Sequence, residues 1–234
     1  MTGSIHSFQS LGATDGPGIR FVVFMQGCNL RCGYCHNPDT WDCSAGKEFT
    51  PEDIFEKVRR YKSYFGKDGG ITVSGGEPLL QAKFVGELFT LCKEDSINTC
   101  LDTSGSVIND DVLSLLDVCD RVLLDIKFTS DEKYREYIGC SMENPTEFLG
   151  ILEQKGIPTW LRQVIVPTLS DDEENIRKLR DIAKNHTCVE KVELLPFRKI
   201  CKAKYDNMGI KFPFEKYDVP SKDTIDKLNE ILLT

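Results

Sequence analysis

Segments of two kinds alternate along this chain, and the alternation limits the folds that it can adopt. Short apolar runs of strand length are followed by longer segments whose apolar residues recur at helical spacing. Strands and helices in alternation predict a sheet of parallel strands joined by right-handed helical crossovers. The predicted strands are Arg20–Gln26, Ile71–Ser74, Thr99–Asp102, Arg121–Asp125, Trp160–Val166 and Lys191–Leu195.

The start of the first predicted helix has a clear sequence signal. Thr50 is a suitable N-cap, Pro51 fits the first helical position, and Glu52 and Asp53 place negative charge in the first turn. The helix is expected to continue to Phe65, with Ile54, Val58, Tyr61 and Phe65 on one face. A second helix carries its apolar residues on one face between Phe84 and Cys92. The other predicted helices are Asp110–Val118, Asp131–Ile138, Pro145–Lys155, Asp172–Lys184 and Asp223–Leu233.

Polar or chemically reactive residues follow nearly every predicted strand. They are the cysteines after the first strand, Ser74–Pro78, Asp102–Gly105, Asp125–Lys127 and Pro196–Arg198. Reactive residues at the carboxyl ends of many strands are typical of (β/α) barrels, whereas a doubly wound sheet gathers them at one switch point. We therefore expect an α/β fold, a partial (β/α)6 TIM-like barrel with parallel strands and outer helices. A length of 234 residues suits a single domain, 1–234.

Composition narrows the classes of partner. The formal net charge of −8 argues against a nucleic-acid binder, which needs basic residues to neutralise phosphates. No apolar run is long enough for a membrane span, and the first residues lack the pattern of a signal peptide. Most of the ten cysteines are scattered singly, which does not suit a disulfide framework. We expect a cytoplasmic monomer that acts on a protein or a small molecule.

Three cysteines, Cys28, Cys32 and Cys35, form a C-x3-C-x2-C run. Four-iron clusters normally take four thiolates, so three leave one iron open to a ligand that is not protein. The alternative is a zinc site completed by His36. That site is disfavoured because His36 directly follows Cys35, and no second Cys-x2-Cys pair lies downstream. A zinc-stabilised binding module remains the alternative from another functional class.

An aromatic residue, Tyr34, precedes the third cysteine, and with this feature the run resembles the cluster motif of the radical S-adenosylmethionine superfamily. The resemblance implies a [4Fe-4S] cluster whose open iron binds S-adenosylmethionine and whose electron produces a 5′-deoxyadenosyl radical. Ser74–Pro78 resembles the superfamily's GGEP motif, in which a backbone stretched past the glycines binds the methionine amino group.

A closer resemblance extends from about Ile5 to the last helix. Several segments are similar, in order and spacing, to the activating enzymes of pyruvate formate-lyase: Asp15–Arg20, Gln26–Cys28, Cys35–Trp41, Ser74–Pro78, Asp125–Lys127, Trp160–Val164 and Leu194–Pro196. The resemblance implies that the protein substrate is pyruvate formate-lyase, that a glycyl radical forms on it, and that flavodoxin or ferredoxin donates the electron. An activase of another glycyl radical enzyme, or a radical enzyme acting on a small molecule, is the rival interpretation. Many of those other activases carry extra Cys-x2-Cys runs, whereas this chain has only Cys43 between Thr40 and Gly70.

The resemblance also implies which residues form the site. The cluster ligands are Cys28, Cys32 and Cys35. The residues that bind the cofactor are Tyr34, Cys35, His36, Gly75, Gly76, Glu77, Asp102, Thr103, Asp125, Ile126, Lys127 and Arg198. Those that bear on the substrate peptide are Asp15 and Arg162, and a monovalent cation is conceivable between Asp102, Thr103 and Asp125. The chain departs from the family at Arg198 and Ala203, where a histidine is usual.

Overall fold

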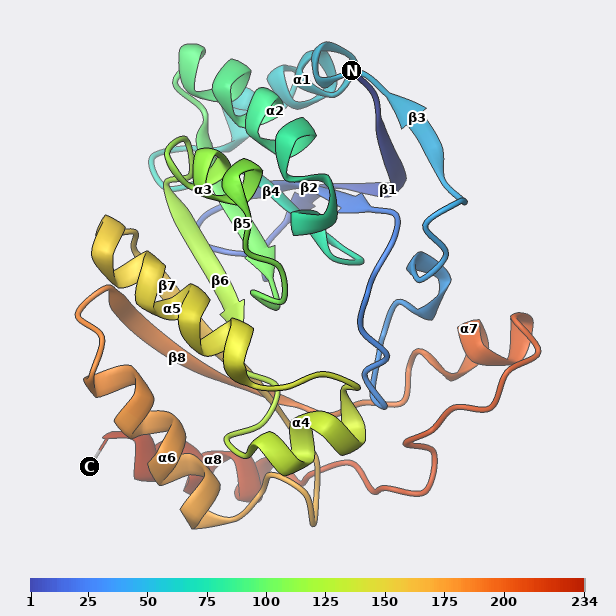
Figure 1. Ribbon diagram of the computed structural model, residues 1–234, viewed down its shortest axis with the longest axis vertical. Coiled ribbons are helices and arrows are strands. Elements are labelled where there is room, and N and C mark those ends of the chain that lie inside the picture. Colours follow the sequence, from blue (N-terminus) through green and yellow to red (C-terminus); the bar gives the residue numbers. More distant parts are fainter. Residues whose placement is uncertain (234) are drawn as a thin grey trace. The chain divides into compact units, whose positions relative to one another are not determined.

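A computed structural model describes residues 1–233, which divide into two compact units. The first unit contains Met1–Asn29 and Thr40–Leu123. The second contains Leu30–Asp39 and the chain from Leu124 onward. We call residues 28–39, which carry the three cysteines of the motif, the cysteine loop; it is divided between the units. Figure 1 shows both units coloured along the chain. No helix among the described residues is long and apolar enough to cross a membrane.

The strands follow the order β3-β1-β2-β4-β5-β6-β7-β8 in a sheet that does not close on itself. Their bounds are β1 Gly3–Gly12, β2 Arg20–Met25, β3 Lys47–Phe49, β4 Gly70–Gly75, β5 Asn98–Thr103, β6 Arg121–Asp125, β7 Thr159–Ile165 and β8 Val189–Pro196. The pairs β2–β4, β4–β5 and β7–β8 are parallel. The predicted α/β fold with an incomplete set of parallel strands is therefore confirmed, and all six predicted strands are present.

Two strands, β1 and β3, were not predicted. Both are antiparallel additions at the N-terminal edge, where β1 pairs with β2 and with β3. The residues of β1 are rich in glycine and serine, and the register with β2 shifts twice, which weakens the alternating apolar pattern. The three residues of β3 are too few to give a periodic signal.

Three α-helices belong to the first unit: α1 Pro51–Arg59, α2 Ala82–Glu94 and α3 Asp110–Leu116. Thr50 and Asp53 form a reciprocal capping box that begins α1, as the sequence predicted. In Figure 1, α2 lies between α1 and α3, and it packs against both. Its apolar face from Phe84 to Cys92 is buried, so α2 provides much of the core of this unit.

Arg20 ties together the starts of three strands of the first unit. Its side chain is fully buried and donates to Thr72 Oγ1 at 3.0 Å, to Asn98 Oδ1 at 2.8 Å and to the carbonyl of Asp68 at 3.1 Å. A further bond reaches the carbonyl of Pro17 at 3.5 Å. Burial lowers the pKa of Arg20. These neutral acceptors fix the turn before β2 against the beginnings of β4 and β5.

Glycines at the ends of β2 and β4 let two backbones touch. Gly76 N–H donates to the Met25 carbonyl at 3.0 Å, and Glu77 N–H donates to the Gly27 carbonyl at 2.8 Å. A Cβ on Gly76 would lie 2.0 Å from the Gly27 oxygen, so only glycine fits there. Gly27 N–H also donates to the Thr40 carbonyl at 2.8 Å. The two ends of the cysteine loop are therefore held together in the first unit.

The second unit has five α-helices: α4 Asp131–Tyr137, α5 Glu143–Lys155, α6 Glu173–Lys184, α7 Lys202–Asn207 and α8 Lys222–Leu233. In this unit α6 and α8 pack against each other and against β8 (Figure 1). Gly156 ends α5 in the left-handed conformation, with φ of 64°. The described residues also contain three short 3-10 helices, at Pro38–Thr40, Lys62–Tyr64 and Pro78–Gln81. Six of the seven predicted helices are confirmed to within two residues at the ends. The first predicted helix continued to Phe65, whereas α1 ends at Arg59 and the 3-10 helix Lys62–Tyr64 follows it. Helix α7 was not predicted.

An aromatic cluster packs around the part of the cysteine loop that lies in the second unit. The Tyr34 ring lies 5.7 Å from that of Phe214 and 6.2 Å from that of Phe128, between centroids. Gly33 N–H donates to the Tyr137 carbonyl at 2.9 Å. A Cβ on Gly33 would lie 2.1 Å from the Phe214 ring. The absence of a side chain at Gly33 therefore allows the ring to cover the loop.

Gly33→Ala is expected to destabilise the protein by about 1–3 kcal/mol, because the new methyl group overlaps the Phe214 ring and forces repacking. Gly150→Ala is the matched control, since Gly150 lies inside α5 with no atom near the position of its missing Cβ. That change should stabilise the protein by about 0.5–1 kcal/mol. Urea unfolding of the cluster-free chain measures both values. Equal stabilities for the two variants would contradict the packing described for Gly33.

Candidate functional site

In the first unit, the loops after β4 and β5 meet through side chains. Ser74 Oγ donates to Asp102 Oδ2 at 2.7 Å. Thr103 Oγ1 donates to Glu77 Oε1 at 2.5 Å. Parallel pairing of β4 with β5 explains the meeting, because their carboxyl ends lie at the same edge of the sheet. The predicted residues Gly75 to Glu77 and Asp102 to Thr103 are therefore neighbours in this unit.

The Glu77 carboxylate accepts hydrogen bonds from other groups of the protein. The side chain is 1% exposed and accepts hydrogen bonds from Ser104 N–H at 3.0 Å, Leu79 N–H at 3.1 Å and the hydroxyls of Thr103 and Ser104. Burial raises the pKa of Glu77, against the opposing effect of these donors. Glu77 thus holds the turn after β4 to the loop after β5.

In the second unit, Asp125 lies between two cations. Lys127 Nζ is 2.6 Å from Asp125 Oδ2, and Arg162 Nε is 3.1 Å from Asp125 Oδ1. Burial raises the pKa of Asp125, but Lys127 and Arg162 outweigh it and hold the pKa below its usual range. The group is therefore an ionised carboxylate with an excess of positive charge around it. Ile126, which lies between Asp125 and Lys127 in the sequence, is buried, and its N–H donates to the Arg162 carbonyl at 2.9 Å.

Cys32 and Tyr34 lie close to this charged group. Burial raises the pKa of the Cys32 thiol to about 12, while Lys127 acts in the opposite direction. The Tyr34 hydroxyl is buried and has no hydrogen-bond partner among residues 1–233. Burial raises its pKa well above the usual value, with Lys127 again opposing. An unsatisfied buried hydroxyl costs about 1–3 kcal/mol, which a bound polar group would recover.

The loop from Cys35 to Asp39 is held by the chain that follows β8. Tyr205 Oη donates to the Cys35 carbonyl at 3.2 Å, and His36 Nε2 is 3.0 Å from the Arg198 carbonyl. Lys204 Nζ donates to Asp39 Oδ1 at 3.0 Å. Burial lowers the pKa of His36. Arg198 contacts the loop through its backbone carbonyl, while its side chain is exposed.

Two residues of these contacts, Tyr205 and Lys204, were not predicted from the sequence. Ser104 lies in the predicted polar segment Asp102–Gly105 after β5, but the sequence indicated no role of its own for it. Tyr205 and Lys204 carry no local signal, because their contacts depend on α7 folding back over the cysteine loop. Such a contact joins residues far apart in the sequence and has no periodicity.

The predicted cluster ligands are divided between the units. Cys28 belongs to the first unit and is half-buried, while Cys32 and Cys35 belong to the second. None of the ten cysteines forms a disulfide, so the three predicted ligands are not committed to one. Within the described residues, no three His, Cys, Asp or Glu side chains are gathered as a metal-binding group. The ligand set therefore stays a prediction that rests on the motif.

Two other predicted groups also stay predictions. Asp15 lies in the turn before β2, where its carbonyl accepts from Thr72 Oγ1 at 2.7 Å. For the monovalent cation, Asp102 and Thr103 belong to the first unit and Asp125 to the second. The carboxylates of Asp102 and Asp125 already accept hydrogen bonds from neighbouring side chains.

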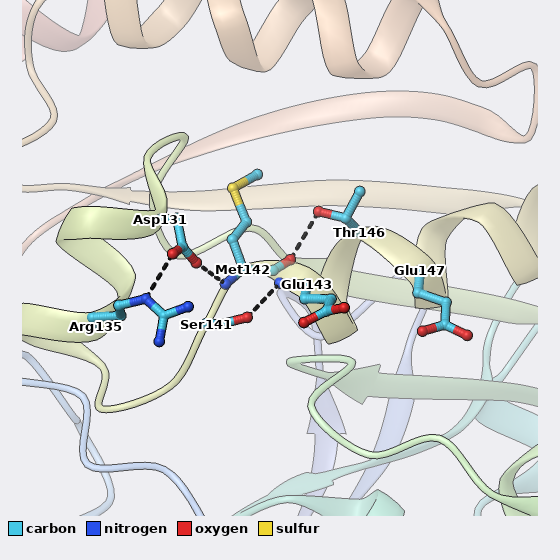
Figure 2. Close-up of a pocket in the computed structure, with 7 residues that line it drawn as sticks. All are labelled: Asp131, Arg135, Ser141, Met142, Glu143, Thr146 and Glu147. Atoms are coloured by element: carbon cyan, nitrogen blue, oxygen red, sulfur yellow. Dashed lines mark hydrogen bonds and ion pairs between the residues drawn. The ribbon is translucent and has the colours of Figure 1, made fainter.

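An open hollow of about 550 Å³ lies where α4 is followed by α5, and Figure 2 shows the side chains that line it. Arg135 Nε is 2.7 Å from Asp131 Oδ2, and the other oxygen of Asp131 accepts from Met142 N–H at 2.8 Å. None of the predicted site residues lines this hollow. Because the charged groups at one end pair with each other, the hollow offers no evident ligand site.

Comparison with known proteins assigns the chain to a family. Residues 22–180 match the profile of the Radical SAM superfamily. The pyruvate formate-lyase-activating enzyme of Clostridium pasteurianum is 46% identical over 98% of this chain and 97% of that protein. The pyruvate formate-lyase 1-activating enzyme of Escherichia coli K12 is 43% identical over 98% of this chain and 95% of that protein.

Solved structures show the same fold. Streptococcus suis SuiB bound to precursor peptide SuiA superposes with a TM-score of 0.70 at 18% identity, covering 91% of this chain and 44% of that one. Sequence identity at this level supports the fold alone. The identities above extend over nearly the full length of this chain and of the activating enzymes. The chain therefore belongs to the Radical SAM superfamily and, within it, to the family of the pyruvate formate-lyase activating enzymes.

Proposed function

We propose that this protein activates pyruvate formate-lyase by abstracting a hydrogen atom from one backbone glycine of that enzyme, leaving a glycyl radical. The observation that carries the proposal is the motif of Cys28, Cys32 and Cys35 in a chain matched almost end to end by curated activating enzymes. An activase of another glycyl radical enzyme is the second candidate. It is disfavoured because only Cys43 lies between Thr40 and Gly70, where many of those activases carry further cysteine pairs.

The cofactors of the superfamily are a [4Fe-4S] cluster and S-adenosylmethionine. When bound, they supply the electron and the 5′-deoxyadenosyl radical that takes the hydrogen atom. We assign the cluster to Cys28, Cys32 and Cys35. Three observations fit this assignment: the thiols are not in disulfides, the loop that carries them is closed at Gly27 and Thr40, and Cys32 lies in the field of Lys127.

For S-adenosylmethionine, the chain offers two sets of polar groups. The backbone at Gly75 and Gly76 has no side chain in the way, and Gly75 has a φ of 115°. We assign this backbone to the methionine amino group. In the second unit, Lys127 provides positive charge for the carboxylate, and Asp125 provides acceptors for the ribose hydroxyls. The unsatisfied Tyr34 hydroxyl is available to a polar atom of a bound cofactor.

A reactive radical needs a site from which water is excluded. The aromatic cluster around Tyr34 supplies buried rings, with Phe128 and Phe214 almost without exposed surface. We propose that these rings shield the radical, while Asp15 and Arg162 contact the glycine loop of the protein substrate. An electron carrier such as flavodoxin or ferredoxin, a monomeric state and a cytoplasmic location belong to the same proposal.

The function is tested by mixing the anaerobically reconstituted protein with dithionite, S-adenosylmethionine and pyruvate formate-lyase. A doublet from a glycyl radical on the partner is expected in the electron paramagnetic resonance spectrum, with one 5′-deoxyadenosine formed for each radical, because a single hydrogen atom is transferred. A Gly→Ala variant of the partner at the radical position is the control and should give no doublet. 5′-Deoxyadenosine without a doublet on the natural partner would direct the search to another substrate.

Cys28→Ala, Cys32→Ala and Cys35→Ala should each lose most of the bound iron and all radical formation, because each removes a proposed ligand. Cys92→Ala is the control, since Cys92 is a buried apolar contact on α2. It should keep both properties. Iron and sulfide analysis after anaerobic reconstitution measures the bound iron, and electron paramagnetic resonance measures radical formation. Full iron loading in any of the three ligand variants would overturn the ligand assignment.

Glu77→Gln is expected to destabilise the protein by about 1–3 kcal/mol, although glutamine has the same shape. The amide oxygen can replace one carboxylate oxygen, but the NH2 group cannot accept, so the backbone N–H of either Leu79 or Ser104 loses its acceptor. Burial raises the pKa of Glu77 in the folded protein above its value in the unfolded chain. The Glu77 side chain therefore stabilises the fold most at low pH, and this stabilisation is lost as the pH rises through the pKa of the folded state. The difference in free energy of unfolding between the unmodified protein and Glu77→Gln should therefore become smaller as pH rises.

Urea unfolding across a pH series measures this change. Glu87→Gln is the matched control, because Glu87 is exposed on α2 of the same unit and should change stability little at any pH. A deficit for Glu77→Gln that stays constant or widens with rising pH would contradict the described environment of the carboxylate.

A further inference from the structure

The chain after β8 has a charge unlike that of the rest of the protein. We call residues Arg198–Lys216 the α7 segment. It contains six basic residues and two acidic ones, in a chain whose formal net charge is −8. Lys202 pairs with both acids, at 3.1 Å from Asp206 and 3.0 Å from Glu215. Lys211 and Lys216 are exposed and have no acidic partner among residues 1–233. The segment therefore presents uncompensated positive charge.

Exposed apolar side chains accompany this charge. The exposed fraction of Ile200 is 76%, that of Met208 is 43% and that of Ile210 is 39%. Large apolar side chains are costly to leave in water, and a group of them among charged residues is typical of a protein interface. The combination indicates that another protein covers this surface.

The α7 segment is held in place by buried aromatic rings. Tyr205, Phe212 and Phe214 are each 3% exposed or less. The Tyr205 and Phe212 rings lie 4.8 Å apart between centroids, and the Phe212 ring lies 6.2 Å from that of Phe197 at the end of β8. The exposed residues therefore sit on an ordered support, so little conformational entropy would be lost when a partner binds.

The inner side of the segment contacts the cysteine loop. Tyr205 Oη donates to the carbonyl of Cys35 itself, and the Arg198 carbonyl contacts His36. Lys204 Nζ bonds the side chains of Asn37 at 2.9 Å and Asp39 at 3.0 Å. A protein docked on the outer side would therefore be separated by one layer of residues from the loop that carries a proposed cluster ligand.

We propose that the α7 segment is the docking surface for a small acidic protein that carries one electron and delivers it to the cluster. This inference rests on the function proposed above. The carrier is oxidised by one electron and the cluster is reduced by one, and no bond or proton changes place. The rate of electron transfer falls steeply with distance, so a carrier must dock close to a ligand loop. The contacts of Tyr205 and Arg198 make this segment such a place.

The charge favours an acidic carrier over other occupants. Redox partners meet through small interfaces, and complementary charge speeds their encounter. A basic surface on an acidic protein attracts an acidic partner locally while the remaining charge repels it elsewhere, which selects one orientation. A nucleic acid is disfavoured because the net charge of −8 repels phosphates over the rest of the surface.

The test uses the reconstituted holoenzyme with the double change Lys211→Glu and Lys216→Glu. Both side chains are exposed, and neither belongs to the proposed cofactor or substrate contacts. Two measurements are made at low and at high salt: the affinity for a purified flavodoxin, and the rate at which reduced flavodoxin bleaches the cluster absorbance. Both should fall about tenfold at low salt, and their dependence on salt should weaken. Radical formation on pyruvate formate-lyase with dithionite should be unchanged.

The matched control is the double change Lys222→Glu and Lys227→Glu on α8, which alters net charge equally at exposed positions of the same unit. It should leave the affinity for flavodoxin within about twofold of that of the unmodified protein, because α8 lies away from α7 in Figure 1 and salt weakens charge interactions with separation. An equal loss in both double variants, or none in the α7 variant, would overturn the proposal. So would weaker binding of pyruvate formate-lyase with unchanged binding of flavodoxin, which would assign the surface to the protein substrate. No radical with dithionite in the unmodified protein would instead overturn the proposed function.

Discussion

The close backbone contact between the ends of β2 and β4 is the constraint on which the candidate site depends. Gly76 and Glu77 donate hydrogen bonds to Met25 and Gly27, at a separation that leaves no room for a Cβ. The contact sets the point from which the cysteine loop leaves, and the bond from Gly27 to Thr40 sets the point to which it returns. Any larger residue at Gly76 would separate the loop from the turn that follows β4.

The carboxylates of Glu77 in the first unit and Asp125 in the second have different surroundings. Glu77 is surrounded by neutral donors, so its carboxylate organises a loop and its pKa rises. Asp125 lies between Lys127 and Arg162, so it stays ionised and the group keeps net positive charge. The first arrangement suits a structural support. The second suits the recognition of a charged or polar ligand, and this difference follows only from which partners the fold brings near.

Residues of the second unit pack over the part of the cysteine loop that belongs to that unit. Aromatic rings pack over Gly33 and Tyr34, and the α7 segment bonds the backbone from Cys35 onward. The same segment presents basic and apolar residues outward. One stretch of chain after β8 therefore has two faces, an inner one that orders the loop and an outer one that suits a protein partner.

The sequence by itself determined the order of strands and helices, the parallel sheet, and the cysteine and glycine motifs, because these depend on local periodicity, capping and spacing. It determined Thr50 as a helix cap. It did not indicate β1 or β3, whose patterns are irregular or short. Only the tertiary structure decided that Glu77 supports a loop, that Tyr34 has an unsatisfied hydroxyl, and that Tyr205 holds Cys35. Those outcomes arise from contacts between residues distant in sequence, and burial and pairing at such contacts leave no local pattern to read.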